Sequence, residues 1–296
     1  MDYLVLVALV PMFAWGSIGL VSGKIGGNAN QQTLGMTMGA LVFSVIVFLA
    51  TQPTMSKWVI IIGLLSGMFW SVGQNGQFRA MNHMGVSVAA PLSTGMQLFV
   101  TTAAGALLFN EWTKTAHYVY GITALVILIA GVYLTSRRDN GTDHVEGVED
   151  DTANFSKGFR ALIISTIGYG MYTIIITWAK TWTEIGDLAI LLPQSIGMLA
   201  GAFAFSVGKI EYNKFVWRNS ATGLLWGIGN MCMLMSVSAV GLAVGFSLSQ
   251  MGIVISTIGG IYLLGERKTK KEMVYVFVGC ALVLVGGILL GYMKTI

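Results

Sequence analysis

Charged residues are scarce in this chain of 296 residues, of which Asp, Glu, Lys and Arg make up only 10%. Soluble domains carry about 25% charged residues, so this chain has too few charges to cover a water-exposed surface. Hydrophobic residues reach 55% and occur in long runs. This composition argues against soluble enzymes, nucleic-acid binders and disordered regulators, and it indicates a polytopic protein of the lipid bilayer.

Cysteine, proline and histidine are also rare. The two cysteines, Cys232 and Cys280, lie in apolar runs, which excludes a disulfide framework. Only 4 prolines accompany 38 glycines, a balance that favours closely packed membrane helices over loops. The 3 histidines have no metal-ligand spacing, and no GxxxxGK[ST] motif is present. We therefore expect no enzyme, no cofactor, no metal and no ATP hydrolysis.

Ten apolar runs are long enough to cross a bilayer, for which about 20 residues are needed. The first run begins Met1-Asp2-Tyr3 without a basic leader or a small-residue cleavage site, which favours a span over a signal peptide. The expected fold is an all-α integral membrane protein with ten transmembrane helices, at residues 3–22, 33–51, 58–78, 85–108, 117–135, 159–179, 187–206, 217–238, 242–264 and 273–293.

Basic residues are distributed unevenly between the connections. One set of loops holds 13 of the 17 lysines and arginines, and the other holds Lys57, Lys114, Lys180 and Lys294. Because positively charged loops stay in the cytoplasm, we expect a cell-membrane protein with both termini outside. The acidic segment 138–157 would then be a cytoplasmic tether between two domains, residues 1–137 and 158–296. A regulatory or partner-binding role for this linker is the alternative.

The two halves of the chain resemble each other in order. Gly35-Met36-Thr37-Met38-Gly39-Ala40 corresponds to Gly197-Met198-Leu199-Ala200-Gly201-Ala202, and Gly63-Leu64-Leu65-Ser66-Gly67 corresponds to Gly223-Leu224-Leu225-Trp226-Gly227. Because each half holds five spans, the second half must enter the membrane from the opposite side. The sequence therefore predicts two inverted five-helix repeats, an architecture typical of secondary transporters. The alternative is that the duplication is only an evolutionary record.

Neutral polar side chains interrupt the spans, whereas charges near mid-span are almost absent. A buried charge is costly in a bilayer, and its absence argues against an ionic substrate. Amides both donate and accept hydrogen bonds, which suits a hydroxyl-rich substrate, and an indole can cover the face of a sugar ring. Helix-to-helix bonding or plain packing is the alternative for each residue. The candidate substrate-binding residues are Trp15, Gln74, Asn75, Gln97, Gln194, Trp226, Asn230 and Gln250.

Several short motifs, taken in order along the ten spans, carry a family resemblance. They are Trp15-Gly16, PLSTGMQ at residues 91–97, WGIGN at 226–230, FSLSQ at 246–250 and LGERK at 264–268. With them the chain resembles the bacterial glucose/ribose porter family of the drug/metabolite transporter superfamily. The resemblance covers nearly the full length and implies ten spans, two inverted halves and monosaccharide uptake with proton symport.

Substrate and coupling follow less directly from this resemblance. WGIGN and the FSLSQ…LGERK stretches look like the glucose-uptake members, whereas Leu192-Pro193-Gln194 looks like the ribose-uptake members. We expect a sugar, most consistently glucose, with ribose uptake or export of a small metabolite as alternatives. The available proton-coupling carboxylates are Asp187, Glu111 and Glu266, each of which also reads as a helix-end charge. The sequence predicts no nucleic-acid partner and leaves the oligomeric state open.

Overall fold

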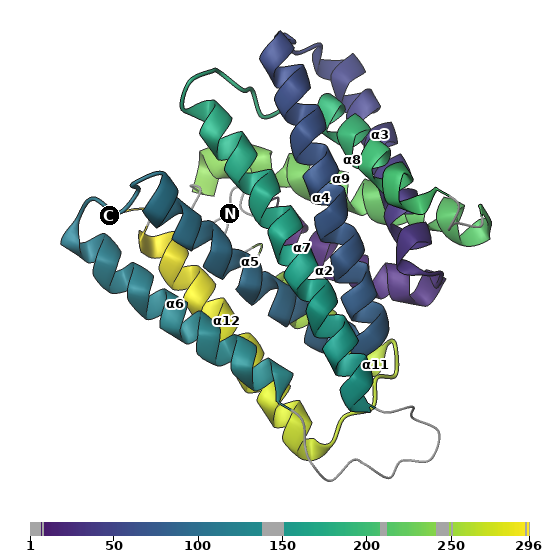
Figure 1. Ribbon diagram of the computed structural model, residues 1–296, viewed down its shortest axis with the longest axis vertical. Helices are drawn as coiled ribbons and strands as arrows, with labels where there is room; N and C mark the ends of the chain where they lie inside the picture. Colours follow the sequence, from purple (N-terminus) through teal and green to yellow (C-terminus); the bar gives the residue numbers. More distant parts are fainter. Residues whose placement is uncertain are drawn as a thin grey trace.

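A computed structural model describes residues 9–137, 151–207, 212–240 and 251–293, together with Val7, Ser249 and Thr295 (Figure 1). These ranges contain helices and connections but no strand, which confirms the all-α class for the part of the chain described. The helices are α2 (Val10–Ile25), α3 (Ala29–Thr51), α4 (Lys57–Met84), α5 (Val86–Leu108), α6 (Thr115–Ser136), α7 (Asp151–Lys180), α8 (Leu191–Ser206), α9 (Lys214–Val240), α11 (Gly252–Tyr262) and α12 (Lys270–Met293).

Five of these helices, α3, α4, α6, α7 and α12, are long and apolar enough to cross a membrane. Their outer faces agree with that composition. On α6, Val119, Ile122, Val126, Ile129 and Tyr133 recur at helical spacing and are each more than half exposed. Such a continuous apolar face is unusual in water and is what lipid would cover. The protein is therefore a multi-pass membrane protein, and the count of ten spans stays a prediction.

Local sequence explains where several helices begin and end. Asn28 and Gln31 form a capping box at the start of α3, and the Ser56 hydroxyl accepts from the backbone N–H of Val59 at the start of α4. Gly85 alone separates α4 from α5, and its φ of +84° is a conformation that favours glycine. The expected span 85–108 thus corresponds closely to α5.

Two expected boundaries differ from the structure or fall outside it. Helix α7 begins at Asp151, so the last residues of the expected linker 138–157 are helical. The expected ninth span, 242–264, contains α11, whereas its residues 242–248 lie outside the described part of the chain. Helix α9 ends at Val240, two residues beyond the expected end of the span 217–238.

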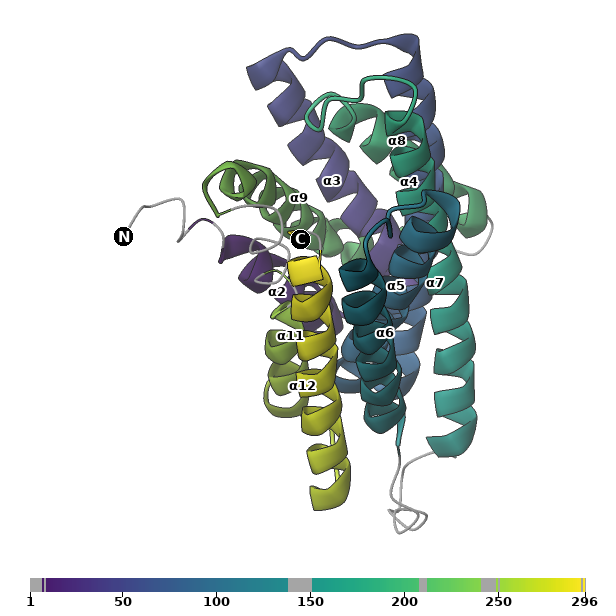
Figure 2. The same ribbon diagram turned by 90° about the vertical axis from the view of Figure 1, so that its left-hand side faces the viewer.

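Helices from the two halves of the sequence pack against one another. Helix α7 lies beside α4 and α5, α9 lies beside α2 and α3, and α12 lies beside α6 (Figures 1 and 2). Glycine permits the closest crossings: a Cβ on Gly16 of α2 would lie only 2.6 Å from the carbonyl oxygen of Gly252 in α11, and Gly39 of α3 meets Gly223 of α9. These backbone contacts position the helices around one central cavity.

One end of the bundle is used below as a reference and is called the linker end. Here α6 finishes and α12 begins, with Arg137 packed over the ring of Tyr275 at 5.0 Å. Helix α7 also begins at this end, where Gly158 packs against Met84, the last residue of α4. The linker end therefore collects the boundaries of α4, α6, α7 and α12, at the bottom of Figure 1.

Candidate functional site

A cavity of about 500 Å³ lies between helices of both halves. Its wall is formed by residues of α2, α4, α5, α7, α9, α11 and α12, and by the connection between α5 and α6. The volume falls within the range of roughly 300–1,000 Å³ that is usual for small-molecule sites. Glu111 is the one charged side chain in the described lining, and the remaining polar groups are amides, hydroxyls and indoles.

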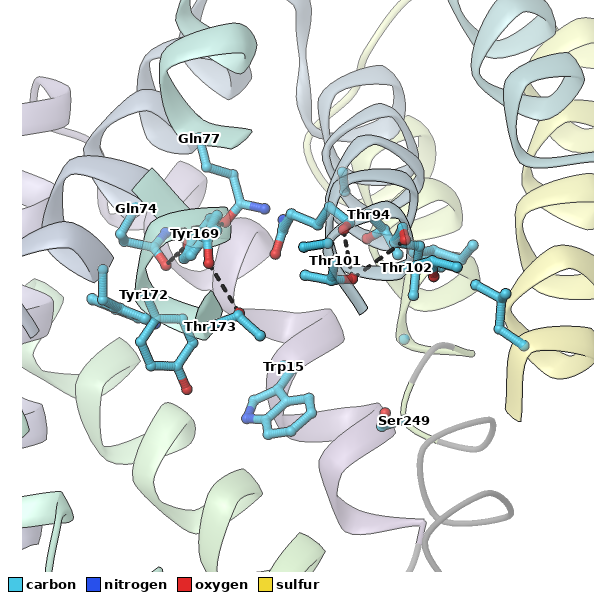
Figure 3. Close-up of a pocket in the computed structure, with 18 of the residues that line it drawn as sticks. Trp15, Gln74, Gln77, Thr94, Thr101, Thr102, Tyr169, Tyr172, Thr173 and Ser249 are labelled. Carbon is cyan, nitrogen blue, oxygen red and sulfur yellow. Dashed lines mark hydrogen bonds between the residues drawn. The ribbon is translucent and has the colours of Figure 1, made fainter. Parts of the chain in front are cut away.

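One wall of the cavity is a hydrogen-bonded cluster on α4 and α7. The Tyr169 hydroxyl donates to Oε1 of Gln74 at 2.7 Å and lies 3.2 Å from Oε1 of Gln77. Nε2 of Gln74 in turn donates to Oε1 of Gln77 at 3.3 Å. Tyr169 and Gln74 are almost fully buried, so this cluster is arranged before any ligand arrives. Figure 3 shows the three side chains together on one side of the cavity.

The facing wall is the polar side of α5. Ser93 accepts hydrogen bonds from Nε2 of Gln77 and from Nε2 of Gln97, each at 2.9 Å, which joins this wall to α4. The Oε1 atom of Gln97 has no hydrogen-bond donor among the described residues and is free to accept from a ligand. Thr94, Thr101 and Thr102 lie across the cavity from Gln74 and Gln77 (Figure 3).

Aromatic rings from four helices, α2, α4, α7 and α9, form another part of the cavity surface. The Trp70 ring lies edge-on to Trp226 at 5.5 Å and edge-on to Tyr169 at 6.0 Å between centroids. Nε1 of Trp15 donates to the backbone carbonyl of Trp226 at 3.3 Å, and Gly229 leaves the space that the Trp15 indole fills. The cavity therefore combines apolar aromatic surfaces with hydrogen-bonding amides. Such an arrangement can cover one face of a ligand ring and form hydrogen bonds with polar groups at its edge.

Hydrogen bonds join the two halves of the chain near the linker end. Asn219 is fully buried; its Oδ1 accepts from the Ser22 hydroxyl at 2.7 Å, and its Nδ2 donates to the carbonyl of Gly26 at 3.2 Å. The Glu266 carboxylate accepts from the backbone N–H groups of Val86 and Ser87 and from the Ser87 hydroxyl. In the opposite direction, the cavity lining extends to Glu111 and the C-terminal end of α12.

Comparison with known proteins then identifies the family. A family model described as "Sugar transport protein" matches residues 6–293. The chain belongs to this sugar transport family. A relative from Enterococcus faecalis is 60% identical over 290 residues, which cover 98% of this chain and 99% of the relative. A relative from Lactiplantibacillus plantarum is 50% identical over 292 residues, with 98% and 99% coverage. Both carry the name "Putative sugar uptake protein", and the predicted membership in a sugar uptake family is confirmed.

A solved structure gives independent support for the fold alone. A crystal structure of another protein, 14% identical in sequence, superimposes on 98% of this chain and 96% of its own chain with a TM-score of 0.58. At this identity the likeness says nothing about substrate. It does indicate that the helix arrangement of this chain also occurs in a protein of very different sequence.

The structure brings most of the predicted substrate-binding residues of this sugar transport protein into one place. Trp15, Gln74, Gln97, Trp226 and Asn230 all line the cavity. Nδ2 of Asn230 donates to the backbone carbonyl of Trp226 at 3.0 Å, and its side-chain oxygen has no donor among the described residues. These five residues come from α2, α4, α5 and α9, so both halves contribute.

The other three candidates lie elsewhere. Asn75 is on the opposite face of α4 from the cavity, where its Nδ2 donates to Oδ1 of Asn30 at 2.9 Å and to Thr33 at 3.2 Å. Gln194 is buried at the crossing of α8 with α4, outside the cavity lining, and its Nε2 has no hydrogen-bond partner among the described residues. Gln250 lies outside the described residues.

The three predicted coupling carboxylates have different surroundings. Glu111 lines the cavity at the connection between α5 and α6. Asp187 forms an exposed ion pair with Lys180 at 2.8 Å. Glu266 caps the start of α5 at the linker end through the bonds described above. Only Glu111 of the three touches the cavity.

Several lining residues were not among the candidates. They are polar or aromatic positions on the same helix faces: Trp70, Gln77, Thr94, Thr101, Thr102, Tyr169, Tyr172 and Thr173. A sequence signal existed for some of them, because Thr94, Gln97 and Thr101 recur at the spacing of one helix face, as do Gln74 and Gln77. For Tyr169 the spacing is uninformative, since its bond to Gln74 joins residues 95 positions apart.

Proposed function

We propose that this protein takes up an uncharged monosaccharide, glucose, and that the sugar binds in the central cavity. The observation that carries this proposal is the pairing of an aromatic surface with amide and hydroxyl groups in one space of about 500 Å³. Each hydroxyl of a sugar both donates and accepts, and amides match that dual capacity. Trp15, Gln74, Gln97, Trp226 and Asn230 are the proposed contacts.

Ribose is the alternative substrate. The preference for glucose rests on the WGIGN and LGERK motifs, and Leu192-Pro193-Gln194 favours ribose. A small-metabolite exporter remains a second function for the same fold, and the direction of flux separates the two. Relatives named for sugar uptake support import.

We further propose that transport proceeds by alternating access between two inverted repeats. Corresponding helices make corresponding contacts: α4 packs on α7 and α8, as α9 packs on α2 and α3. The repeats also share a helix ending. Asn110 and Gly265 have left-handed φ values of 51° and 71°, and each precedes a glutamate whose N–H donates to the carbonyl six residues earlier. Closure at the linker end, with a cavity reaching the other end, is what one state of such a cycle requires.

Glu111 is our proposed proton-coupling residue. It is the carboxylate in the cavity wall, where a proton and a sugar could affect each other's binding. The Glu111→Gln variant should transport sugar without a response to an imposed pH gradient, whereas Asp187→Asn, which removes an exposed carboxylate, should respond as the parent does. Retention of gradient-driven accumulation by Glu111→Gln would refute this assignment.

We also propose an orientation for this protein in the cell membrane, with both termini outside and the linker in the cytoplasm. It follows from the distribution of lysine and arginine. Cysteines placed at Thr54 and Thr142 in a cysteine-free variant should react with an impermeant maleimide from opposite sides of the membrane. Reaction of the Thr54 position from the cytoplasmic side would reverse the assignment.

The decisive experiment is uptake of radiolabelled glucose and ribose into proteoliposomes, with and without a pH gradient. We expect glucose to accumulate and unlabelled glucose to compete for its entry. Accumulation of ribose alone would assign the alternative substrate. If neither sugar accumulates or exchanges under any gradient, the proposed function fails.

A further inference from the structure

A second pocket, of about 390 Å³, lies on the side of α4 and α7 that faces away from the cavity. Four basic side chains line it: Arg79 and His83 from α4, and Lys157 and Arg160 from α7. Both pairs belong to the linker end, since α4 finishes at Met84 and α7 begins at Asp151. The pocket is therefore a concentration of positive charge at one boundary of the membrane-spanning bundle.

Arg79, Lys157 and Arg160 have no anionic partner in the described part of the chain, where Lys180 and Asp187 form an ion pair. Arg79 donates through Nη2 to Oδ1 of Asn30 at 3.3 Å, a neutral group that leaves its charge uncompensated. A guanidinium carries five N–H donors in a fork that matches a phosphate, so Arg79 and Arg160 retain ample capacity for an anion.

Apolar groups make up the rest of the pocket, and this decides what kind of anion fits. Val72, Ile164 and Phe205 share the lining with the basic residues. Along α7, Ile164 is 52% exposed and Ile167, about one turn further from the linker end, is 59% exposed. A charged pocket thus continues into an apolar surface. A phosphate in water gains nothing from such neighbours, whereas a phospholipid presents an anionic head group followed by acyl chains.

We propose that this pocket binds the phosphate head group of an anionic phospholipid, with the acyl chains lying along α7. Basic pockets between membrane helices are suited to this chemistry. The site is independent of the proposed sugar specificity, yet it is close to the cavity. On α4, Gln74 and Gln77 face the cavity, and Asn75 and Arg79 face the pocket.

The crossing of α4 with α7 joins the two sites mechanically. A Cβ on Gly76 would lie 2.7 Å from the carbonyl oxygen of Ala161, so the two helix backbones are in direct contact beside the pocket. A head group held by Lys157 and Arg160 on α7 and by Arg79 on α4 would bridge the same two helices that hold Tyr169 against Gln74.

Native mass spectrometry of the full-length protein, released from detergent with equimolar phosphatidylglycerol and phosphatidylcholine, tests the proposal. We expect the parent to retain phosphatidylglycerol selectively. Lys157→Gln/Arg160→Gln should lower that retention roughly thirtyfold, since each basic residue near an anionic lipid surface strengthens binding by about fivefold. Lys214→Gln/Arg218→Gln removes the same two charges from the start of α9, outside the pocket, and should leave retention unchanged. Arg79→Gln provides a second pocket variant if the double variant misfolds.

Three outcomes would overturn the proposal. Equal losses in the α7 and α9 double variants would mean that net charge alone attracts the lipid. Displacement of phosphatidylglycerol by 10 mM sodium phosphate would make the site a free-phosphate site. A gain in lipid retention after Glu146→Gln/Glu149→Gln would make the acidic linker of this chain the occupant.

Discussion

The contact between Glu266 and the start of α5 offers the sharpest test of alternating access. Its carboxylate accepts from two backbone N–H groups and the Ser87 hydroxyl. Hydrogen bonds to a charged group contribute about 1.5–3 kcal/mol and neutral ones about 0.5–1.5 kcal/mol. Glu266→Gln removes the charge and one acceptor oxygen while it keeps the shape. We therefore expect the state closed at the linker end to lose about 1–3 kcal/mol, roughly 5- to 150-fold in its equilibrium with the other state.

Accessibility of the cavity from the linker side measures this shift. Met81 lines the cavity on the part of α4 closest to the linker end, so Met81→Cys, in a variant without Cys232 and Cys280, reports opening there. The reaction of Cys at position 81 with an impermeant maleimide, added to vesicles from the linker side, should become faster by up to about 150-fold. The lower end of the range is expected if water already reaches Glu266, which is half-buried.

Glu272→Gln is the matched control, because this substitution also removes one negative charge at the linker end. Its carboxylate accepts from the N–H of Thr269 at 3.1 Å, and its own N–H donates to the Thr269 hydroxyl, a cap at the start of α12. This bond does not join the two halves. If both variants raise the labelling rate equally, or if Glu266→Gln leaves it unchanged, the reasoning that the Glu266 contact closes this end is refuted.

Two further predictions concern the cavity. Gln97→Ala and Asn230→Ala should each impair sugar uptake more than Trp58→Ala, because Trp58 is 40% exposed and packs outside the cavity; equal, mild effects in an uptake assay would remove the site assignment. Tyr169→Phe leaves Oε1 of Gln74 without its 2.7 Å donor, at a cost of about 1–3 kcal/mol, so the KM for sugar uptake should rise several-fold. The control Tyr212→Phe, at an exposed position, should leave KM unchanged. An unchanged KM for Tyr169→Phe would contradict a role for the cluster.

Helix positions could be predicted because their causes are local. Long apolar runs and residues such as Gly85 and Ser56 mark spans and boundaries regardless of what surrounds them. The face of a helix that meets the cavity is a different matter. Gln74 and Asn75 are adjacent amides on one helix, and only packing against α7 on one side and α3 on the other sends them to different places. A helix with polar groups around its circumference does not reveal which of them face inward.

The carboxylates illustrate the same limit at the level of the whole bundle. Glu111 and Glu266 each follow a Leu-Leu pair and share the same helix ending, so the local sequence does not indicate which of them meets the cavity. The structure separates them because Glu111 lines the cavity, whereas Glu266 caps the start of α5. That difference arises from contacts between segments about 180 residues apart, such as Glu266 with Val86.

Four of the eight tryptophans, Trp15, Trp70, Trp112 and Trp226, lie in the cavity lining. Trp70 is edge-on to Trp226, and Trp15 donates to the backbone carbonyl of Trp226. A ligand that displaces water from these indoles would change their emission, so the protein carries its own optical reporter of occupancy. Titration of intrinsic fluorescence would then measure equilibrium affinity without a label and separate weak binding from slow transport.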